Sequence, residues 1–235
     1  MTYSHLTIDS DSAIKRFSHR KRFSIARQLL AVTAGHRVLD YGAGDGYFLR
    51  FVGSSQPAAT MVSYDPSQEM LSQMRGATSP RVIANAVSDV SGIQDQSFDR
   101  IACLEVLEHL TENEQIDTLR QMRRFLTTDG LLLVSVPIEI GPSAIAKNVA
   151  RLMAGHPHPG ASLRNVVRSA FGMPVARDAA RLSHIGFDHR ELRRLFSKCG
   201  WEIEATVCSP WPLLGLLLNS QIFFVLRPAA VTPVL

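Results

Sequence analysis

The sequence predicts an α/β protein whose seven-stranded, mostly parallel sheet is doubly wound, with helices on both faces. Short β-type runs alternate with helical periodicities along most of the 235 residues. The first β-type run ends in a glycine-rich turn that leads straight into a helix. The composition, 46% hydrophobic and 20% charged, is that of a folded domain and not of a disordered chain. We therefore expect one domain over residues 1–235.

The first expected element is a helix within the N-terminal segment 1–33. Between Ile14 and Val32, apolar residues recur at near-helical spacing among lysines and arginines, which predicts a basic amphipathic helix. The following strands are expected at 37–40, 60–65, 82–86, 99–104 and 131–136, with helices at 47–52, 67–75 and 112–126 between them. Asp65 or Ser67 is expected to cap the second of these helices, and an Asp129-Gly130 turn to precede the fifth strand.

The alternation breaks after Pro137. Two helical stripes separated by the breaker His156-Pro-His-Pro-Gly160 predict a helical insertion, or cap, over residues 138–187. Between residues 141 and 187, six Lys and Arg residues stand against the single acid Asp178, so this segment accounts for the net charge of +4. The alternation resumes with a helix at 189–199, which Gly200 ends, and with strands at 201–207 and 220–226.

The remaining composition excludes several classes of protein. Cys103, Cys199 and Cys208 form no C-x-x-C pair, so neither a disulfide framework nor a zinc cage is expected. His156 and His158 have no third ligand nearby, and no metal site is predicted. The N-terminus lacks the apolar run of a secretory signal, and Pro212–Leu226 falls short of the ~20 apolar residues of a spanning helix. We expect a cytoplasmic protein, either free or peripheral at the inner face of the membrane.

The glycine-rich turn is the most informative motif. Val38-Leu-Asp-Tyr-Gly-Ala-Gly-Asp-Gly46 follows a strand and precedes a helix, so its backbone N–H groups can approach a ligand, although a purely structural tight turn would use the same glycines. Asp65, at the end of the next strand, is placed to accept both hydroxyls of a ribose. Asp40 would repel a diphosphate but would favour a ligand that carries a cationic ammonium and a sulfonium.

These residues resemble motif I of the class I S-adenosylmethionine-dependent methyltransferases, which have a Rossmann-like fold. The resemblance extends over most of the chain: residues 63–71 resemble the ribose-binding motif, residues 97–99 and 104–110 the fourth-strand motif, and residues 125–137 the fifth strand. Within the superfamily these motifs are most similar to those of small-molecule and quinone-type O-methyltransferases and of relatives associated with glycan assembly. The resemblance therefore implies S-adenosylmethionine as the cofactor.

The resemblance also implies which residues bind the cofactor. The glycine loop would line its methionine part, Asp40 would reach its amino group, and Asp65 would hold the ribose. The family's usual acid after the third strand is missing, because Ala86 and Val87 stand about there, with Asp89 the nearest acid; backbone contacts are expected to replace it. The implied cofactor residues are Asp40, Tyr41, Gly42, Ala43, Gly44, Asp65, Pro66, Met70, Ala86, Val87, Leu104 and Glu105.

A hydroxyl acceptor benefits from a general base, and two histidines are candidate catalytic residues. His109 follows the fourth strand in a Glu-His pair and faces the active-site mouth in this fold; it could instead cap the following helix or hydrogen-bond the loop. His184 opens the segment that closes over the substrate in relatives, and a structural role for it stays equally open.

The predicted function is methyl transfer, to oxygen in our interpretation, on a small-molecule or lipid-linked acceptor. Arg164 and Arg168 share one helix face of the insertion, as do Lys147 and Arg151, which suggests an anionic acceptor or an anionic membrane surface. Nucleic acid is not expected as a partner, because the excess charge sits on one insertion with little aromatic interleaving. A cofactor-binding inactive partner subunit, a membrane-docked scaffold and a nicotinamide oxidoreductase are the alternatives, and the oligomeric state is left open.

Overall fold

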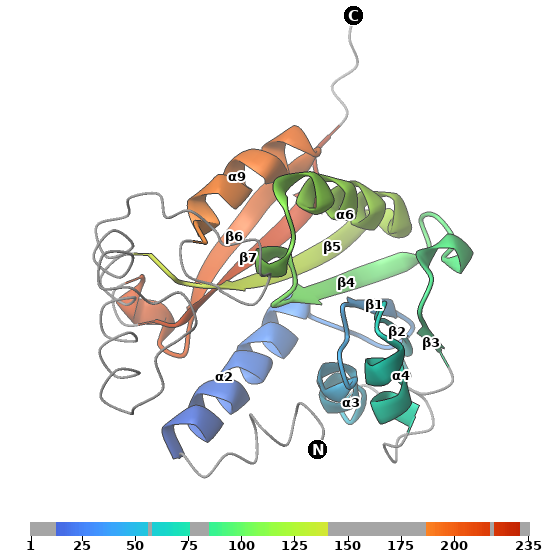
Figure 1. Cartoon of the computed structure of the whole chain (residues 1–235), viewed down its shortest axis with the longest axis horizontal. Helices are drawn as coiled ribbons and strands as arrows, with labels where there is room; N and C mark the ends of the chain where they lie inside the picture. The colour runs from blue at the N-terminus through green and yellow to red at the C-terminus, as the bar shows by residue number, and fades with distance from the viewer. Residues whose placement is uncertain (1–12, 56–57, 76–84, 141–186, 217–218, 231–235) are drawn as a thin grey trace, which may run out of the picture.

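The computed structural model describes residues 13–55, 58–75, 85–140, 187–216 and 219–230. Their sheet has seven strands in the order β3-β2-β1-β4-β5-β7-β6 (Figure 1). The strands are β1 (Arg37–Tyr41), β2 (Thr60–Tyr64), β3 (Ala86–Val87), β4 (Phe98–Leu104), β5 (Leu126–Pro137), β6 (Trp201–Ser209) and β7 (Gln221–Pro228). Only β7 runs antiparallel to its neighbours among these strands, so the expected mostly parallel, Rossmann-like sheet is confirmed.

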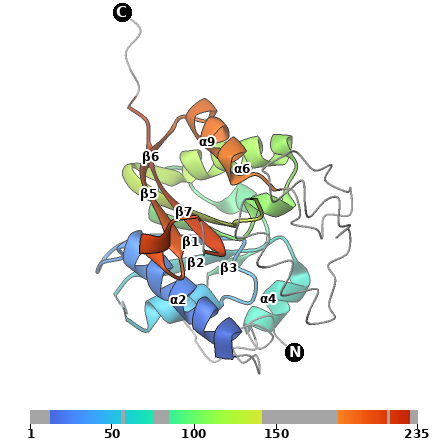
Figure 2. The ribbon, with the colours of Figure 1, turned by 90° about the vertical axis from the view of Figure 1, so that its left-hand side faces the viewer.

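Helices cover both faces of the sheet. α2 (Ala13–Leu30), α3 (Tyr47–Gly53) and α4 (Gln68–Arg75) lie on one face, and α6 (Glu112–Phe125) and α9 (His189–Lys198) lie on the other (Figure 2). The short 3-10 helices are η1 (Val90–Gly92), η2 (Leu107–His109) and η3 (Pro212–Leu214). None of the described helices combines the length and the apolar character that crossing a bilayer requires.

Alternate residues of the central strands supply two separate cores. In β5, Leu132 and Val134 pack toward α6 and α9, whereas Leu131 and Leu133 pack toward α2 and α3. Side chains of a strand point alternately to opposite faces, so a strand that is covered on both faces is apolar at every position. The strand order reverses between β1 and β4, and ligands of doubly wound sheets bind at the carboxyl ends of the strands on either side of such a point.

Two expected elements differ from the structure. β3 is Ala86–Val87 and not 82–86, of which residues 82–84 lie outside the described residues. β5 begins at Leu126, so the expected Asp129-Gly130 turn lies within the strand. Phe98 of β4 pairs with Leu126 and Arg100 with Leu131, so the extra residues form a bulge. Gly130 fits there because a Cβ would strike the Leu126 side chain.

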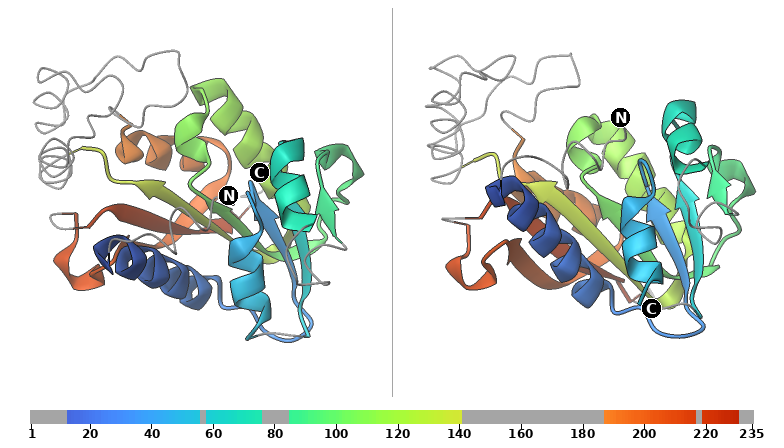
Figure 3. Two further views of the ribbon diagram at one scale, coloured as in Figure 1. Left: turned by 60° about the horizontal axis from the view of Figure 1, so that its bottom comes forward. Right: turned by 90° about the horizontal axis from the view of Figure 1, so that it is seen from below.

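The N-terminal helix, α2, has the bounds that its periodicity predicts to within two residues at either end. It lies across the same face of the sheet as α3 (Figure 3). The greater part of the expected insertion, residues 141–186, lies outside the described residues, and with it His184 and the basic residues counted above.

Candidate active site

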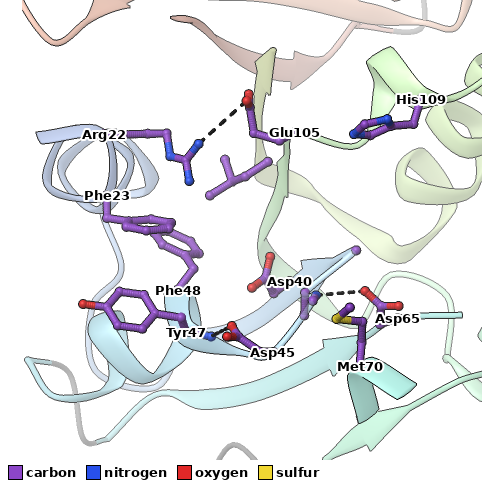
Figure 4. Close-up of a pocket in the computed structure, with 14 residues that line it drawn as sticks. Arg22, Phe23, Asp40, Asp45, Tyr47, Phe48, Asp65, Met70, Glu105 and His109 are labelled. Carbon is purple, nitrogen blue, oxygen red and sulfur yellow. Dashed lines mark hydrogen bonds and ion pairs between the residues drawn. The ribbon is translucent and has the colours of Figure 1, made fainter. Parts of the chain in front are cut away.

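A pocket of about 400 Å³ opens at the carboxyl ends of β1, β2 and β4. Figure 4 shows side chains from α2, from the loop between β1 and α3, and from the end of β4 converging on it. Its lining residues are Arg22, Phe23, Asp40, Gly42, Ala43, Gly44, Asp45, Tyr47, Phe48, Asp65, Met70, Leu104, Glu105 and His109.

The glycine loop forms one edge of this pocket. Gly42, Gly44 and Gly46 have φ values of 80°, 56° and 73°, a left-handed conformation that glycine adopts without strain. The N–H groups of Gly42 and Ala43 both donate to the Tyr64 carbonyl, which ties the loop to the end of β2. A Cβ at Gly42 would strike the Val106 side chain, whereas one at Gly44 would meet no atom within 4 Å. Gly44 therefore leaves open space beside a potential ligand.

Asp65, at the end of β2, is held by two backbone groups. Its Oδ2 accepts from the Gly44 N–H at 2.8 Å and its Oδ1 from the Ser67 N–H at 2.9 Å. Each carboxylate oxygen has a second lone pair that remains available to a hydroxyl group. Ser67, and not Asp65, caps α4, because its Oγ accepts from the Met70 N–H at 3.4 Å. The free carboxylate edge therefore belongs to the pocket.

Three acids, Asp40, Asp45 and Asp65, line the floor of the pocket. Asp40 is buried, and burial, followed by the charges of Asp65 and Asp45, raises the pKa of its carboxyl to about 8. A cationic ligand would relieve the repulsion among these carboxylates, whereas a diphosphate would increase it. The carboxylates and the open space at Gly44 therefore fit a ligand with an ammonium and a sulfonium group.

Glu105 connects the pocket to the far strands of the sheet. It stands at the end of β4 with φ +59°, a conformation that is uncommon outside glycine and costs conformational energy. Its Oε1 accepts from Gln221 Nε2 of β7, and its Oε2 lies 3.7 Å from Arg22 Nη1 of α2 (Figure 4). This ion pair fixes α2 beside the pocket mouth.

An aromatic wall lies next to the ion pair. The Phe23 ring centroid is 5.3 Å from that of Tyr47 and 5.8 Å from that of Phe48, and the Arg22 guanidinium lies 4.8 Å above the Phe23 ring. Such packing gives the mouth an apolar surface with one cation at its rim. The pocket also contains five residues that were not predicted from the sequence: Arg22, Phe23, Asp45, Tyr47 and Phe48.

Most of the predicted site residues meet at this pocket. Those that line it are Asp40, Gly42, Ala43, Gly44, Asp65, Met70, Leu104, Glu105 and His109. The Tyr41 side chain lies outside it, because strand alternation points the ring to the opposite face, where it contacts Tyr64 and donates to Gln121 Oε1 at 2.8 Å. Pro66 is exposed, and Ala86 and Val87 of β3 are not among the lining residues.

His109 lies at the pocket mouth, at the end of η2. Figure 4 shows its ring and the Glu105 side chain in the upper half of the pocket. It does not cap the following helix. Thr111 does so: its Oγ1 accepts from the Glu114 N–H at 3.4 Å, and the Glu114 carboxylate accepts from the Thr111 N–H at 2.8 Å. Capping of α6 by His109 is therefore wrong, whereas a hydrogen bond from His109 to the loop stays the structural alternative to a catalytic role.

Comparison with known proteins gives the family. Residues 14–206 match a family model described as a methyltransferase domain, and the chain belongs to this family. The strand order and the covering helices agree with this assignment, because they form the Rossmann-like fold of class I methyltransferases.

Two relatives illustrate its neighbours in sequence. A ubiquinone biosynthesis O-methyltransferase of Xanthomonas oryzae pv. oryzae is 28% identical over 134 residues, which are 53% of this chain and 55% of the relative. The methyltransferase GfsG of Streptomyces halstedii is 30% identical over 112 residues, 45% of this chain and 39% of the relative. The chain thus spans about half the length, or less, of the curated relatives that it matches.

Solved structures share the fold over nearly the whole chain. The PH0226 protein of Pyrococcus horikoshii has a TM-score of 0.63 at 15% identity, covering 95% of each chain. The cyclopropane synthase MmaA2 of Mycobacterium tuberculosis has a TM-score of 0.61 at 13% identity, covering 96% of this chain and 89% of that one.

Proposed function

We propose that the protein binds S-adenosylmethionine in this pocket and transfers its methyl group to an oxygen atom of a small-molecule or lipid-linked acceptor. The observation that carries the proposal is the set of three carboxylates, Asp40, Asp45 and Asp65, around a glycine loop at the ends of β1 and β2. When bound, the cofactor supplies a methyl group on a cationic sulfur, which is already a strong electrophile. The protein then has to bind the cofactor and the acceptor, orient them toward each other and exclude water from the site.

Each residue has a distinct part in this proposal. Asp65 accepts the ribose hydroxyls with the lone pairs that Gly44 and Ser67 leave free, and Asp40 faces the cationic end of the cofactor. Met70 and Leu104 supply apolar contact. Alignment of the acceptor with the methyl group accounts for several kcal/mol of the barrier.

The acceptor side is formed by the mouth of the pocket. His109 takes the proton of the attacking hydroxyl, and Phe23 with its aromatic neighbours holds the apolar part of the acceptor. Transfer to oxygen is supported by the likeness to the ubiquinone biosynthesis O-methyltransferase. An anionic acceptor is proposed from the basic character of residues 141–186, and reversing Arg164 and Arg168 to Glu should raise its KM.

Two experiments test the proposal. Calorimetry should detect binding of S-adenosylmethionine and none of NAD, because the acidic pocket favours a cationic ligand over an anionic diphosphate. Extracts incubated with methyl-labelled cofactor are then separated into lipid and aqueous phases, with a Gly44→Val variant as the inactive control. Tight binding without labelled product in either phase would favour the inactive partner subunit, and preferential binding of NAD would favour the oxidoreductase.

A further inference from the structure

The exposed large apolar side chains in the described part of the chain gather at one place. They are Phe17 of α2 together with Trp211, Leu213, Leu214 and Leu216 around η3, and we call these five residues the apolar tip. The two segments meet where the Phe17 and Trp211 ring centroids lie 6.2 Å apart. Figure 3 shows η3, in orange, beside the start of α2, in dark blue, in both views. Leu213 is 100% exposed.

The tip is presented by a well-bonded loop. Asn219 is buried, and its side chain accepts from the Trp211 N–H at 2.7 Å and donates to the carbonyls of Trp211 and Gly215 at 2.7 and 2.6 Å. Asn219 thus holds the two ends of residues 211–215 together, while the residues from Trp211 to Leu216 are all exposed. Exposed apolar patches of this kind mark interaction sites in folded proteins.

Cations surround the tip along α2. This helix carries six Lys and Arg residues and no acid, and Arg16, Arg20 and Lys21 line one groove with Phe17. In the described residues neither Arg20 nor Lys21 forms an ion pair with an acid. Like charges at adjacent turns disfavour a helix, so this arrangement is not explained by helix stability.

We propose that the apolar tip and the cations of α2 dock the protein on an anionic lipid bilayer. Leucine and tryptophan side chains enter the interfacial layer, where tryptophan is enriched, and Arg20 and Lys21 meet the anionic headgroups. A second copy of the chain fits this face poorly, because a twofold contact would bring the same cations together. Arg22 and Phe23, which line the pocket mouth, follow Lys21 directly, so docking here places the mouth within a few residues of the headgroups.

Sedimentation of the full chain with vesicles tests this surface without the cofactor. The protein should bind vesicles of equal parts phosphatidylglycerol and phosphatidylcholine, and should not bind phosphatidylcholine alone. Leu213→Gln with Leu214→Gln, and separately Arg20→Gln with Lys21→Gln, should each weaken binding by about tenfold. Arg194→Gln with Lys198→Gln, two exposed cations on α9, is the matched control and should bind as the unchanged protein does.

The substituted residues lie outside the pocket. Melting temperatures equal to that of the unchanged protein establish that each variant folds. Failure of the unchanged protein to bind the anionic vesicles overturns the proposal, as does undiminished binding by both test variants. A dimer in ultracentrifugation that only the Leu213/Leu214 variant dissociates, without vesicle binding, would assign the face to a second copy. None of these results depends on whether a methyl group is transferred, so failure here is distinguishable from failure of the proposed function.

Discussion

Asp65 Oδ2 accepts a hydrogen bond from the Gly44 backbone N–H at 2.8 Å, so the acid at the end of β2 and the glycine loop after β1 form one unit. The second oxygen accepts from the Ser67 N–H at 2.9 Å. The carboxylate is thus oriented before a ligand arrives, and a site ordered in advance binds more tightly because less freedom is lost on binding.

Replacement of Asp65 should therefore affect both stability and affinity. Asp65→Ala leaves two backbone N–H groups without their acceptor, which costs about 1–3 kcal/mol of folding free energy, and removes the ribose acceptor, which weakens cofactor binding at least tenfold. Asp95→Ala, which removes an exposed carboxylate that pairs with Arg124 and does not line the pocket, is the control. Calorimetry of Asp65→Ala that gives an unchanged dissociation constant would refute the ribose assignment.

Substitution of two glycines of the loop should have different effects, mainly on stability at Gly42 and mainly on cofactor binding at Gly44. Gly42→Ala places a Cβ against Val106 and should lower stability by about 2–4 kcal/mol, from left-handed strain and overpacking together. Gly44→Ala meets no atom within 4 Å and should cost only the backbone strain of about 1–2 kcal/mol, but it should weaken cofactor binding more than tenfold.

Thermal unfolding and calorimetry on the two variants separate these effects. A Val106→Ala change should restore part of the stability of Gly42→Ala, since the two substitutions share one contact. Normal binding by a folded Gly44→Ala variant would show that the space beside Gly44 is not used by the cofactor.

The raised pKa of Asp40 predicts a pH dependence of binding. With its pKa at about 8, the buried carboxyl of the free protein is largely protonated at neutral pH. A cationic ligand favours the ionised form, so affinity should increase as pH rises toward 8 and level off above it. Asp40→Asn should weaken binding and abolish this dependence. A flat affinity profile in the unchanged protein from roughly pH 6 to pH 9 would contradict the assignment.

The raised pKa of Asp40 also predicts how the folding stability changes with pH. The folded state holds the Asp40 proton more tightly than the unfolded chain, where a carboxyl ionises near pH ~4. Stability conferred by this group is therefore lost as pH rises from about 4 to about 8. Asp40→Asn should raise the melting temperature of the free protein above pH ~8, although it impairs binding. An unchanged or lower melting temperature there would indicate that the ionised carboxylate is compensated.

The sheet could be predicted because its signal is local. A strand is apolar at every position where both of its faces are covered, and residues 101–104 of β4, 131–134 of β5 and 222–226 of β7 carry that pattern directly in the sequence. The start of β5 could not be predicted, because a bulge opposite Arg100 absorbs a dipeptide that elsewhere forms a turn. Pairing with β4 and the covering helices overrides that local preference.

The residues of the site likewise divide into those that can be predicted from the sequence and those that cannot. Residues of the pocket that follow a strand directly, such as Asp40, Gly44 and Asp65, are fixed by spacing along the chain. Tyr47 and Phe48 come directly after the glycine loop, so the same spacing along the chain indicates their place at the site. Arg22 and Phe23 reach the pocket only because α2 packs across the sheet and pairs with Glu105, which no sequence spacing specifies.

The catalytic base gives the last prediction. His109 lines the pocket mouth while Thr111 caps α6, so removing the imidazole should leave the helix intact. If it takes the acceptor proton, His109→Ala should lower turnover by about two to four decades with cofactor affinity unchanged. His36→Ala is the matched control, because His36 precedes β1 at the opposite edge of the sheet and its side chain bonds Thr33, far from the pocket. A loss of turnover below about tenfold in His109→Ala would show that another group is the base. Glu105 faces the same pocket, and Glu105→Gln, which keeps the shape of the side chain, should then lose turnover instead.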